Sequence, residues 1–449
     1  MTAVPVAARS PLTFGQVTRV REFRWLWLAD VQSLLGDQLA RVALSVLVYE
    51  RTRSSVLTAG TYALTFIPAL AGSFLLGHLA DRVPRRALLV LGDLLRAGLL
   101  ALMAIPGTPL AVMTVLLVAS VIIGTPWKAA ESALVADILA GEGYVLGAGL
   151  RFATSQGAQL IGFAAGGAAV AAIGSRPALG IDALTFLISA VFIRLGVQKR
   201  PAAAGRGTTT HGRAGLRSWL AGVAMITGRP ELRSLLGLSW LAGLFVVPEG
   251  LAAPYAAALH GGPRVIGLLL AATPAGTLVG AVLLTRFVGG ARRGRLVGPL
   301  AIVAGIPLAL CALQPGLLAT IVLWALTGAC VSYQIQIITE YVAAVDSAAR
   351  GQAIGLLTSG LLAVQGLGLL GAGLLSQWLD PATAIAWCGV TAVALAVPAA
   401  WSRRRHNAPV DPAPRVTLAG SGWSSQETSV AGWASSASGP TDDSMPSAV

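Results

Sequence analysis

The sequence predicts an all-α integral membrane protein whose twelve transmembrane helices form two six-helix pseudo-repeats. Of its 449 residues, 55% are apolar and only 11% are charged, and the mean hydropathy is +0.74. In a soluble chain about a quarter of the residues are charged. Apolar stretches run from Trp25 to Trp401. At about 20 residues per crossing, they provide roughly a dozen helices with short connections.

Each predicted helix is an apolar run bounded by charged, Gly or Pro residues. The runs are 25–49, 56–79, 87–105, 110–129, 146–173 and 177–195 in the first half, and 232–259, 265–288, 296–313, 316–339, 352–378 and 381–401 in the second. An amphipathic stretch over 131–143 precedes the fifth helix, and a basic, Gly- and Thr-rich linker over 199–217 follows the sixth. The Ser-, Gly- and Pro-rich residues after Arg405 are expected to be disordered.

Lys and Arg fall almost entirely on one side of the predicted membrane. The side that holds both termini carries 26 of them, and the opposite side carries four. Because cytoplasmic loops are enriched in Lys and Arg, we expect both termini in the cytoplasm and the chain in the plasma (inner) membrane. The predicted segments are a cytoplasmic N-terminus, a bundle, a cytoplasmic linker, a second bundle and a cytoplasmic tail, at 1–24, 25–198, 199–231, 232–401 and 402–449.

An internal repeat appears when the sequence is shifted by 209 residues. The shift aligns charged residues at corresponding helix ends: Arg24 with Arg233, Arg86 with Arg295, Glu131 with Glu340, and Asp137 with Asp346. Several matches at one offset indicate a duplicated six-helix unit. Parallel halves with a substrate path near the midplane between them are typical of transporters.

The residue types argue against several other classes of protein. The net charge of +13 gathers between apolar runs without interleaved aromatic residues, so no nucleic acid partner is expected. The four histidines are scattered, and Cys311, Cys330 and Cys388 lie in different apolar runs, so neither a metal site nor a disulfide is expected. The sequence has no H-E-x-x-H motif, no nucleophile with its base and no Gly-rich Lys-Ser/Thr phosphate loop. We therefore expect neither an enzyme nor an ATP-driven pump, and no cofactor.

The turn between the second and third predicted helices carries a family signature. Residues 77–86 read GHLADRVPRR and resemble the pattern G-x-L-A-D-R-x-G-R-R of the major facilitator superfamily, with Pro84 in place of the usual Gly. The matching positions are Gly77, Leu79, Ala80, Asp81, Arg82, Arg85 and Arg86. Stretches at 23–44, 92–100 and 181–190 are similar to the drug-efflux branch of macrolide- and enterobactin-exporter type. The resemblance implies the major facilitator fold.

The resemblance also implies two motifs with mechanical roles. Asp81 and its neighbouring arginines would form a cytoplasmic latch against the second half, near Arg350; the alternative is a positive-inside turn in which Asp81 favours the helix start. In the fifth helix, residues 156–167 resemble the family's antiporter motif G-x-x-x-x-G-P-x-x-G-G, with Phe163 in place of Pro. Its matching glycines are Gly157, Gly162, Gly166 and Gly167. Small residues at this spacing serve close helix packing equally well.

Ionisable residues at membrane depth are unfavourable and indicate functional sites. Asp37 and Arg41 are four residues apart in the first helix and share a face, where they can neutralise each other or take part in proton coupling. Asp93 and Arg96, three apart in the third helix, are expected to form an ion pair that supports the gate motif. Glu131 is expected to anchor the fourth helix at the membrane interface.

The seventh and tenth helices contribute three further candidates. Pro248 and Pro254 flank Glu249, which places this acid in a flexible gate or in a hydrated outer vestibule. By resemblance, the first, fourth, seventh and tenth helices surround the substrate cavity, which adds Trp240 and Gln334. Gln334 could bind a ligand or only a neighbouring helix.

These observations predict a secondary transporter that exports an amphipathic small molecule in exchange for protons by alternating access. The bilayer is its environment, and by resemblance it works as a monomer. A dedicated exporter or symport importer of one metabolite remains an alternative. A membrane scaffold that does not transport is another.

The latch interpretation predicts that Asp81→Asn preserves expression but abolishes most transport, because the carboxylate is the acidic partner in the latch. Transport assays on cells with matched protein levels check this. Full transport by the variant would exclude the latch.

Overall fold

The computed structural model describes residues 14–139, 141–201, 223–224, 228–345 and 349–406. Most of the predicted N-terminal segment, linker and tail lies outside these ranges, whereas residues 402–406 of the predicted tail belong to the last described helix. The described residues form helices and no strand, and twelve helical stretches among them are long and apolar enough to cross a membrane. This confirms the predicted fold class. All of these residues belong to one compact unit, residues 1–407.

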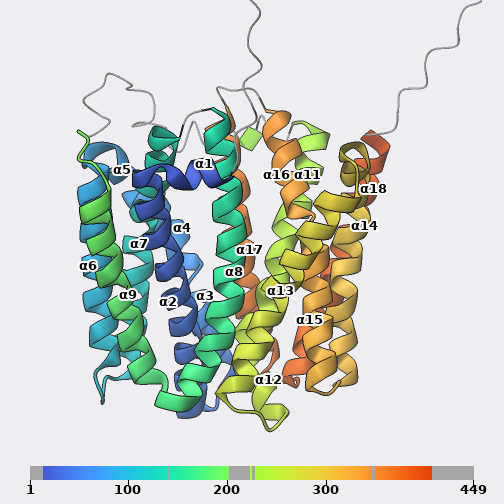
Figure 1. The fold of residues 1–449 in the computed structure, drawn as a ribbon. Coiled ribbons are helices and arrows are strands. Elements are labelled where there is room, and N and C mark those ends of the chain that lie inside the picture. Colours follow the sequence, from blue (N-terminus) through green and yellow to red (C-terminus); the bar gives the residue numbers. More distant parts are fainter. Residues whose placement is uncertain (1–13, 140, 202–222, 225–227, 346–348, 407–449) are drawn as a thin grey trace, which may run out of the picture. The chain divides into compact units, whose positions relative to one another are not determined.

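The helices of the first half form the blue-to-green part of the bundle (Figure 1). They are α1 (Phe14–Arg19), α2 (Arg21–Thr52), α3 (Ser55–Ala63), α4 (Ile67–Leu76), α5 (Leu79–Arg82), α6 (Arg85–Ala104), α7 (Leu110–Ile138), α8 (Glu142–Ile173) and α9 (Ser175–Gly196). The second predicted crossing is divided between α3 and α4, and the short α5 lies in the turn that carries the family signature.

The helices of the second half form the yellow-to-red part (Figure 1). They are α11 (Pro230–Leu241), the 3-10 helix η2 (Ala242–Val246), α12 (Val247–Ala258), α13 (Pro263–Phe287), α14 (Gly290–Ala309), the 3-10 helix η3 (Leu310–Leu313), α15 (Leu317–Val331), α16 (Gln334–Ala343), α17 (Arg350–Leu375) and α18 (Pro381–His406). The seventh crossing is formed by α11, η2 and α12, and the tenth by α15 and α16.

Two crossings predicted as unbroken helices are interrupted next to a proline. The second is interrupted after Ala63, where Pro68 lacks the N–H that would bond to the carbonyl of Leu64. The seventh narrows into η2, where Pro248 cannot bond to the carbonyl of Leu244. Proline therefore sets local breaks that hydropathy alone does not reveal.

The fourth crossing shows the opposite difference. It was predicted to end at residue 129, followed by a separate amphipathic stretch, but α7 continues to Ile138. The proline at position 126 cannot bond to the carbonyl of Ile122, and the Thr125 hydroxyl donates to that carbonyl at 2.8 Å instead. Glu131 is buried in α7, so this part of the helix is held inside the protein rather than along the membrane surface.

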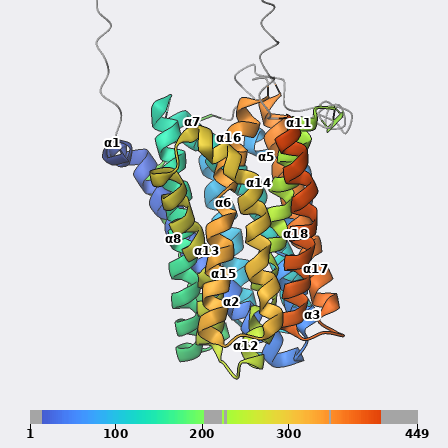
Figure 2. The ribbon, with the colours of Figure 1, turned by 90° about the vertical axis from the view of Figure 1, so that its right-hand side faces the viewer.

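The two halves meet through small residues at the membrane side opposite α1. Helix α8 packs against α13, and α3 packs against both α12 and α17; Figures 1 and 2 show α8 beside α13 in both views. A Cβ atom added to Gly167 would lie 2.7 Å from the Cα of Gly267, and one added to Gly373 would lie 2.9 Å from the Cβ of Ala59. Backbone and small side chains thus form part of the contact between the halves.

The glycine motif of the fifth crossing has mainly packing contacts. An added Cβ would lie 2.8 Å from Gln38 Cβ at Gly162 and 3.1 Å from Leu39 Cα at Gly166, both on α2. At Gly157 it would meet no atom within 4 Å. Three of the four motif glycines therefore occupy close helix contacts, and the role of the motif in antiport remains a prediction.

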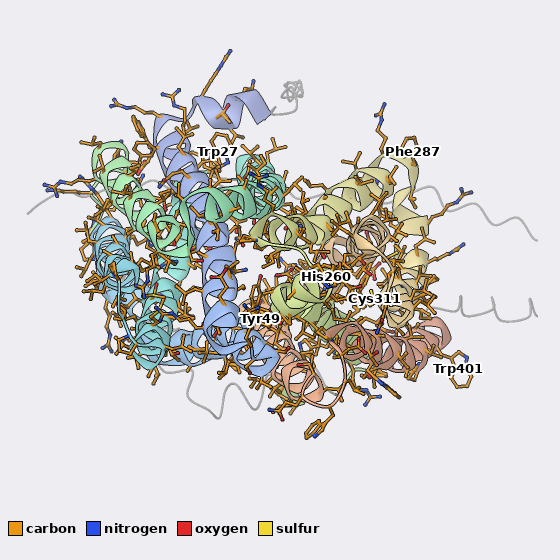
Figure 3. All side chains as sticks on the ribbon, turned by 90° about the horizontal axis from the view of Figure 1, so that it is seen from below. Trp27, Tyr49, His260, Phe287, Cys311 and Trp401 are labelled. Atoms are coloured by element: carbon orange, nitrogen blue, oxygen red, sulfur yellow. The ribbon has the colours of Figure 1, made fainter. Side chains whose placement is uncertain are left out.

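Large apolar side chains cover the outside of the bundle. Phe287 and Trp401 project away from the helices (Figure 3) and are 74% and 60% exposed. Cys311 lies inside the second half and is buried. An apolar exterior of this kind fits a hydrocarbon environment.

The contact between α8 and α13 predicts that Gly167→Ala lowers the thermal unfolding midpoint, because the new methyl group pushes two backbones apart. Overpacking of this kind typically destabilises by about 1–3 kcal/mol. Thermal unfolding of the purified protein in detergent checks this. Gly157→Ala is the matched control and should leave the midpoint unchanged or slightly higher; equal effects of both variants would contradict the packing account.

Candidate functional site

A partly buried ion pair joins the first and third crossings. Arg96 of α6 donates to Asp37 of α2 at 2.9 Å, and its guanidinium carbon lies 3.9 Å from the ring centre of Phe186 on α9. The Asp37 side chain retains 28% exposure, whereas that of Arg96 is 13% exposed. The acid of the pair is therefore more accessible than the cation.

This pair corrects two predicted partnerships. Pairing of Asp37 with Arg41 was one of two alternatives, and Arg96 was expected to pair with Asp93, because each pair shares a helix face. The structure instead pairs Asp37 with Arg96, and Ser189 donates to Asp93 at 2.6 Å. Helix spacing identifies side chains on one face but does not show which neighbouring helix offers a closer partner.

A hydrogen bond between the two halves involves Glu249. The hydroxyl of Tyr62, in α3, donates to Glu249 Oε2, in α12, at 2.5 Å. The guanidinium of Arg41 lies over the rings of Tyr62 and Phe66, 5.7 and 5.9 Å from their centres. Arg41 and Glu249 thus both contact Tyr62, a connection that their positions in the sequence do not reveal.

A second charged cluster lies toward the α1 end of the first half. Arg151 of α8 is 2.5 Å from Glu131 of α7 and 3.6 Å from Asp30 of α2. Glu131 and Asp30 are both buried. The expected interfacial anchoring of Glu131 was therefore wrong, because this acid pairs inside the bundle. The sequence signal for Glu131 was its match to Glu340 under the 209-residue shift. That match did not identify Arg151 as the partner of Glu131.

Trp240 and Gln334 form contacts within the second half. The Trp240 indole donates to the carbonyl of Leu357 at 3.2 Å. Gln334 donates to the carbonyl of Ser239 at 2.8 Å and accepts from its hydroxyl at 3.1 Å. Gln334 thus links α16 to α11. Contact with a neighbouring helix was one of the two predicted alternatives for this residue. A role for either residue in substrate binding remains a prediction.

Two arginines of the gate motif bond to neighbouring helices. Gly77 caps α4, Arg85 forms an ion pair with Asp137, and Arg86 donates to the carbonyl of Arg194. The side chain of Asp81 lies outside the described part of the chain, and Arg82 is exposed. Arg350 donates to the carbonyl of Val345 at 3.3 Å. The latch between Asp81 and the second half therefore remains a prediction.

The site is polar, helical and without a metal-binding cluster. Among the described residues, no group of three or more His, Cys, Asp or Glu side chains could hold a metal ion. The site instead offers paired acids and arginines at membrane depth, plus one acid whose hydrogen bond crosses between the halves. Such groups can hold and release protons as the helices move.

A sequence profile described as Major Facilitator Superfamily matches residues 26–253, which is more than half of the chain. The chain belongs to the major facilitator superfamily. As a member it is a multi-pass membrane transporter rather than an enzyme. A search of curated proteins found no match.

Solved structures of this superfamily share the fold. A bacterial homologue of the human lysosomal transporter Spinster, in an inward-facing and unoccupied conformation, has a TM-score of 0.61 at 17% identity; the match covers 85% of this chain and 96% of that one. A POT family transporter in complex with 5-aminolevulinic acid has a TM-score of 0.67 at 12% identity, covering 86% and 97%. At these identities the likeness concerns the fold alone.

The Asp37–Arg96 pair predicts a measurable coupling energy. Arg96→Gln should lower stability because it leaves Asp37 without its cation, and adding Asp37→Asn should recover part of the loss. For residues in direct contact the coupling is about 0.5–3 kcal/mol, and unfolding of the four proteins of the double-mutant cycle in detergent measures it. Arg85→Gln, which removes an arginine whose partner Asp137 is 35% exposed, should change stability by only roughly 0–1 kcal/mol. Purely additive single effects would contradict the pairing.

Proposed function

We propose that this member of the superfamily exports amphipathic small molecules in exchange for protons, by alternating access between its two halves. Both termini would lie on the cytoplasmic face of the plasma membrane. The observation that supports proton coupling is the 2.5 Å hydrogen bond from Tyr62 to Glu249, which joins the halves through a carboxyl group. The direction of transport and the class of compound rest on the resemblance of residues 23–44, 92–100 and 181–190 to drug exporters.

The placement of the contacts between the halves supports a conformation closed on one side. The Gly167–Gly267 and Ala59–Gly373 contacts lie toward the membrane side opposite α1, as does the Tyr62–Glu249 bond. Such a molecule exchanges substrate with the side of its termini. Opening to the other side requires the Ala59–Gly373 and Tyr62–Glu249 contacts to separate.

Protonation of Glu249 offers a physical link between proton binding and that separation. An ionised carboxylate accepts a charge-assisted hydrogen bond, which is roughly twice as strong as a neutral one. Adding a proton to Glu249 therefore weakens its attachment to Tyr62 and favours separation of α3 from α12. Loss of the proton restores the bond and favours closure. Because the bond crosses the halves, its strength changes the relative stability of the two conformations.

The proposal predicts that Tyr62→Phe and Glu249→Gln each reduce proton-driven export. Efflux-deficient bacterial cells are loaded with lipophilic dyes and macrolides, and retention is followed with and without a protonophore. Wild type should lower retention, and the protonophore should abolish that effect. Each variant should reduce the export rate roughly tenfold or more, because hydrogen bonds to charged groups contribute about 1.5–3 kcal/mol.

Tyr49→Phe is the matched control, because the described Tyr49 hydroxyl makes no hydrogen bond to a described residue. It should export normally. Export that survives both site variants but stops with the protonophore would move the coupling to Asp37, which Asp37→Asn then tests. Unchanged retention of every compound by wild type would reject broad export and favour a dedicated exporter, an importer or a scaffold.

A further inference from the structure

A pocket of about 570 Å³ lies between the start of α6 and the segment that follows α9. Four cationic side chains line it: Arg86, Arg194, Lys199 and Arg200. The remainder of its wall includes Leu91 and Leu94 of α6. No carboxylate is among the lining residues. The pocket thus combines positive charge with an apolar surface.

Two of the four cations already have partners within the protein. Arg200 forms a bidentate pair with Glu22 of α2, and its Nη2 atom lies 2.8 Å from Oε2. The hydrogen bond to Glu22 raises the pKa of the Arg200 guanidinium, so this cation stays ionised. Arg86 donates to the backbone carbonyl of Arg194, which leaves its charge without a counterion among the described residues.

Arg194 and Lys199 are the cations of the pocket whose side chains have neither a counterion nor a hydrogen-bond partner among the described residues. Both side chains are exposed, and neither makes a hydrogen bond or ion pair with another described residue. They lie at or just after the end of α9, which is on the same side of the bundle as α1 (Figure 1). An anion that enters the pocket meets an excess of positive charge.

The apolar wall faces the membrane. Leu91 is 54% exposed and Leu94 is 47% exposed on α6, and Leu195 beside the pocket is 68% exposed. These side chains lie along crossings that contact hydrocarbon, next to the end where the cations gather. The ligand that fits both surfaces carries an anionic head and an apolar chain.

The corresponding arginine of the second half has a counterion. The 209-residue shift aligns Arg194 with Arg403, whose side chain is 8% exposed and lies 2.5 Å from Glu340. That arginine has an internal counterion, whereas Arg194 has none among the described residues. The lack of a counterion at this position is therefore particular to the first half.

We propose that the pocket between α6 and α9 binds an anionic phospholipid from the membrane leaflet on the N-terminal side. The phosphate lies against Arg194 and Lys199, and an acyl chain follows Leu91 and Leu94 along α6. Cationic clusters at the membrane-facing ends of helices attract anionic head groups in this way. The inference does not depend on the direction, substrate or coupling of transport.

Binding of phosphatidylglycerol and phosphatidylcholine to the full-length protein, purified and delipidated in detergent, tests the proposal. Native mass spectrometry over a range of lipid concentrations gives the two affinities. Wild type should prefer phosphatidylglycerol. The double variant Arg194→Gln/Lys199→Gln should bind it roughly tenfold or more weakly, because each cation near a head group contributes substantially to attraction.

Arg292→Gln/Arg295→Gln is the matched control, because it removes two charges from exposed arginines at the start of α14. This control should retain the wild-type preference. Equal affinity of wild type for both lipids, or equal loss in both double variants, would overturn the proposal. Competition by glycerol 3-phosphate as effective as that by phosphatidylglycerol would assign the pocket to a soluble anion and also overturn it. The comparison of the two lipids and the competition by glycerol 3-phosphate are made on wild type, so they do not depend on whether a variant folds.

Discussion

Ionisable side chains at membrane depth need partners within the protein, because the surrounding hydrocarbon offers none. In three places the described helices meet this requirement through bonds between crossings. Arg96 links α6 to α2, Arg151 brings α8 to α7 and α2, and Tyr62 links α3 to α12. Each bond fixes the rotation of two helices as well as neutralising or solvating a charge. The polar layer therefore specifies which faces of these apolar helices point inward, which hydrophobicity alone specifies weakly in a membrane.

The fold class could be predicted from the sequence because length, hydropathy and charge distribution all depend on the bilayer thickness. The partners of the buried charges could not, because they depend on which helices become neighbours. Asp37 illustrates this point: Arg41 is nearest along its own helix, yet Arg96 approaches from α6. Glu131 looked like an interfacial residue only because its cation, Arg151, lies on the next crossing. The sequence contains Pro68 and Pro248, but the backbone hydrogen bond that each proline removes is known only once the helical register is known.

Both ends of the bond between the halves lie close to helix interruptions. Tyr62 precedes the turn that separates α3 from α4, and Glu249 follows η2 at the start of α12. A short helical segment next to an interruption can change its direction while the rest of the crossing keeps its hydrogen bonds. The phenol–carboxyl bond thus joins two crossings next to the points where their helical hydrogen bonding is interrupted.

At Gly167 and Gly267 two backbones meet with no side chain between them. Interlocking side chains would have to leave one set of rotamers and enter another whenever α8 turned on α13. Two bare backbones can roll over each other without that rearrangement. The contact therefore serves as a pivot for rocking of the two halves. Bonds that lie farther from this contact, such as Tyr62–Glu249, resist that rocking more strongly.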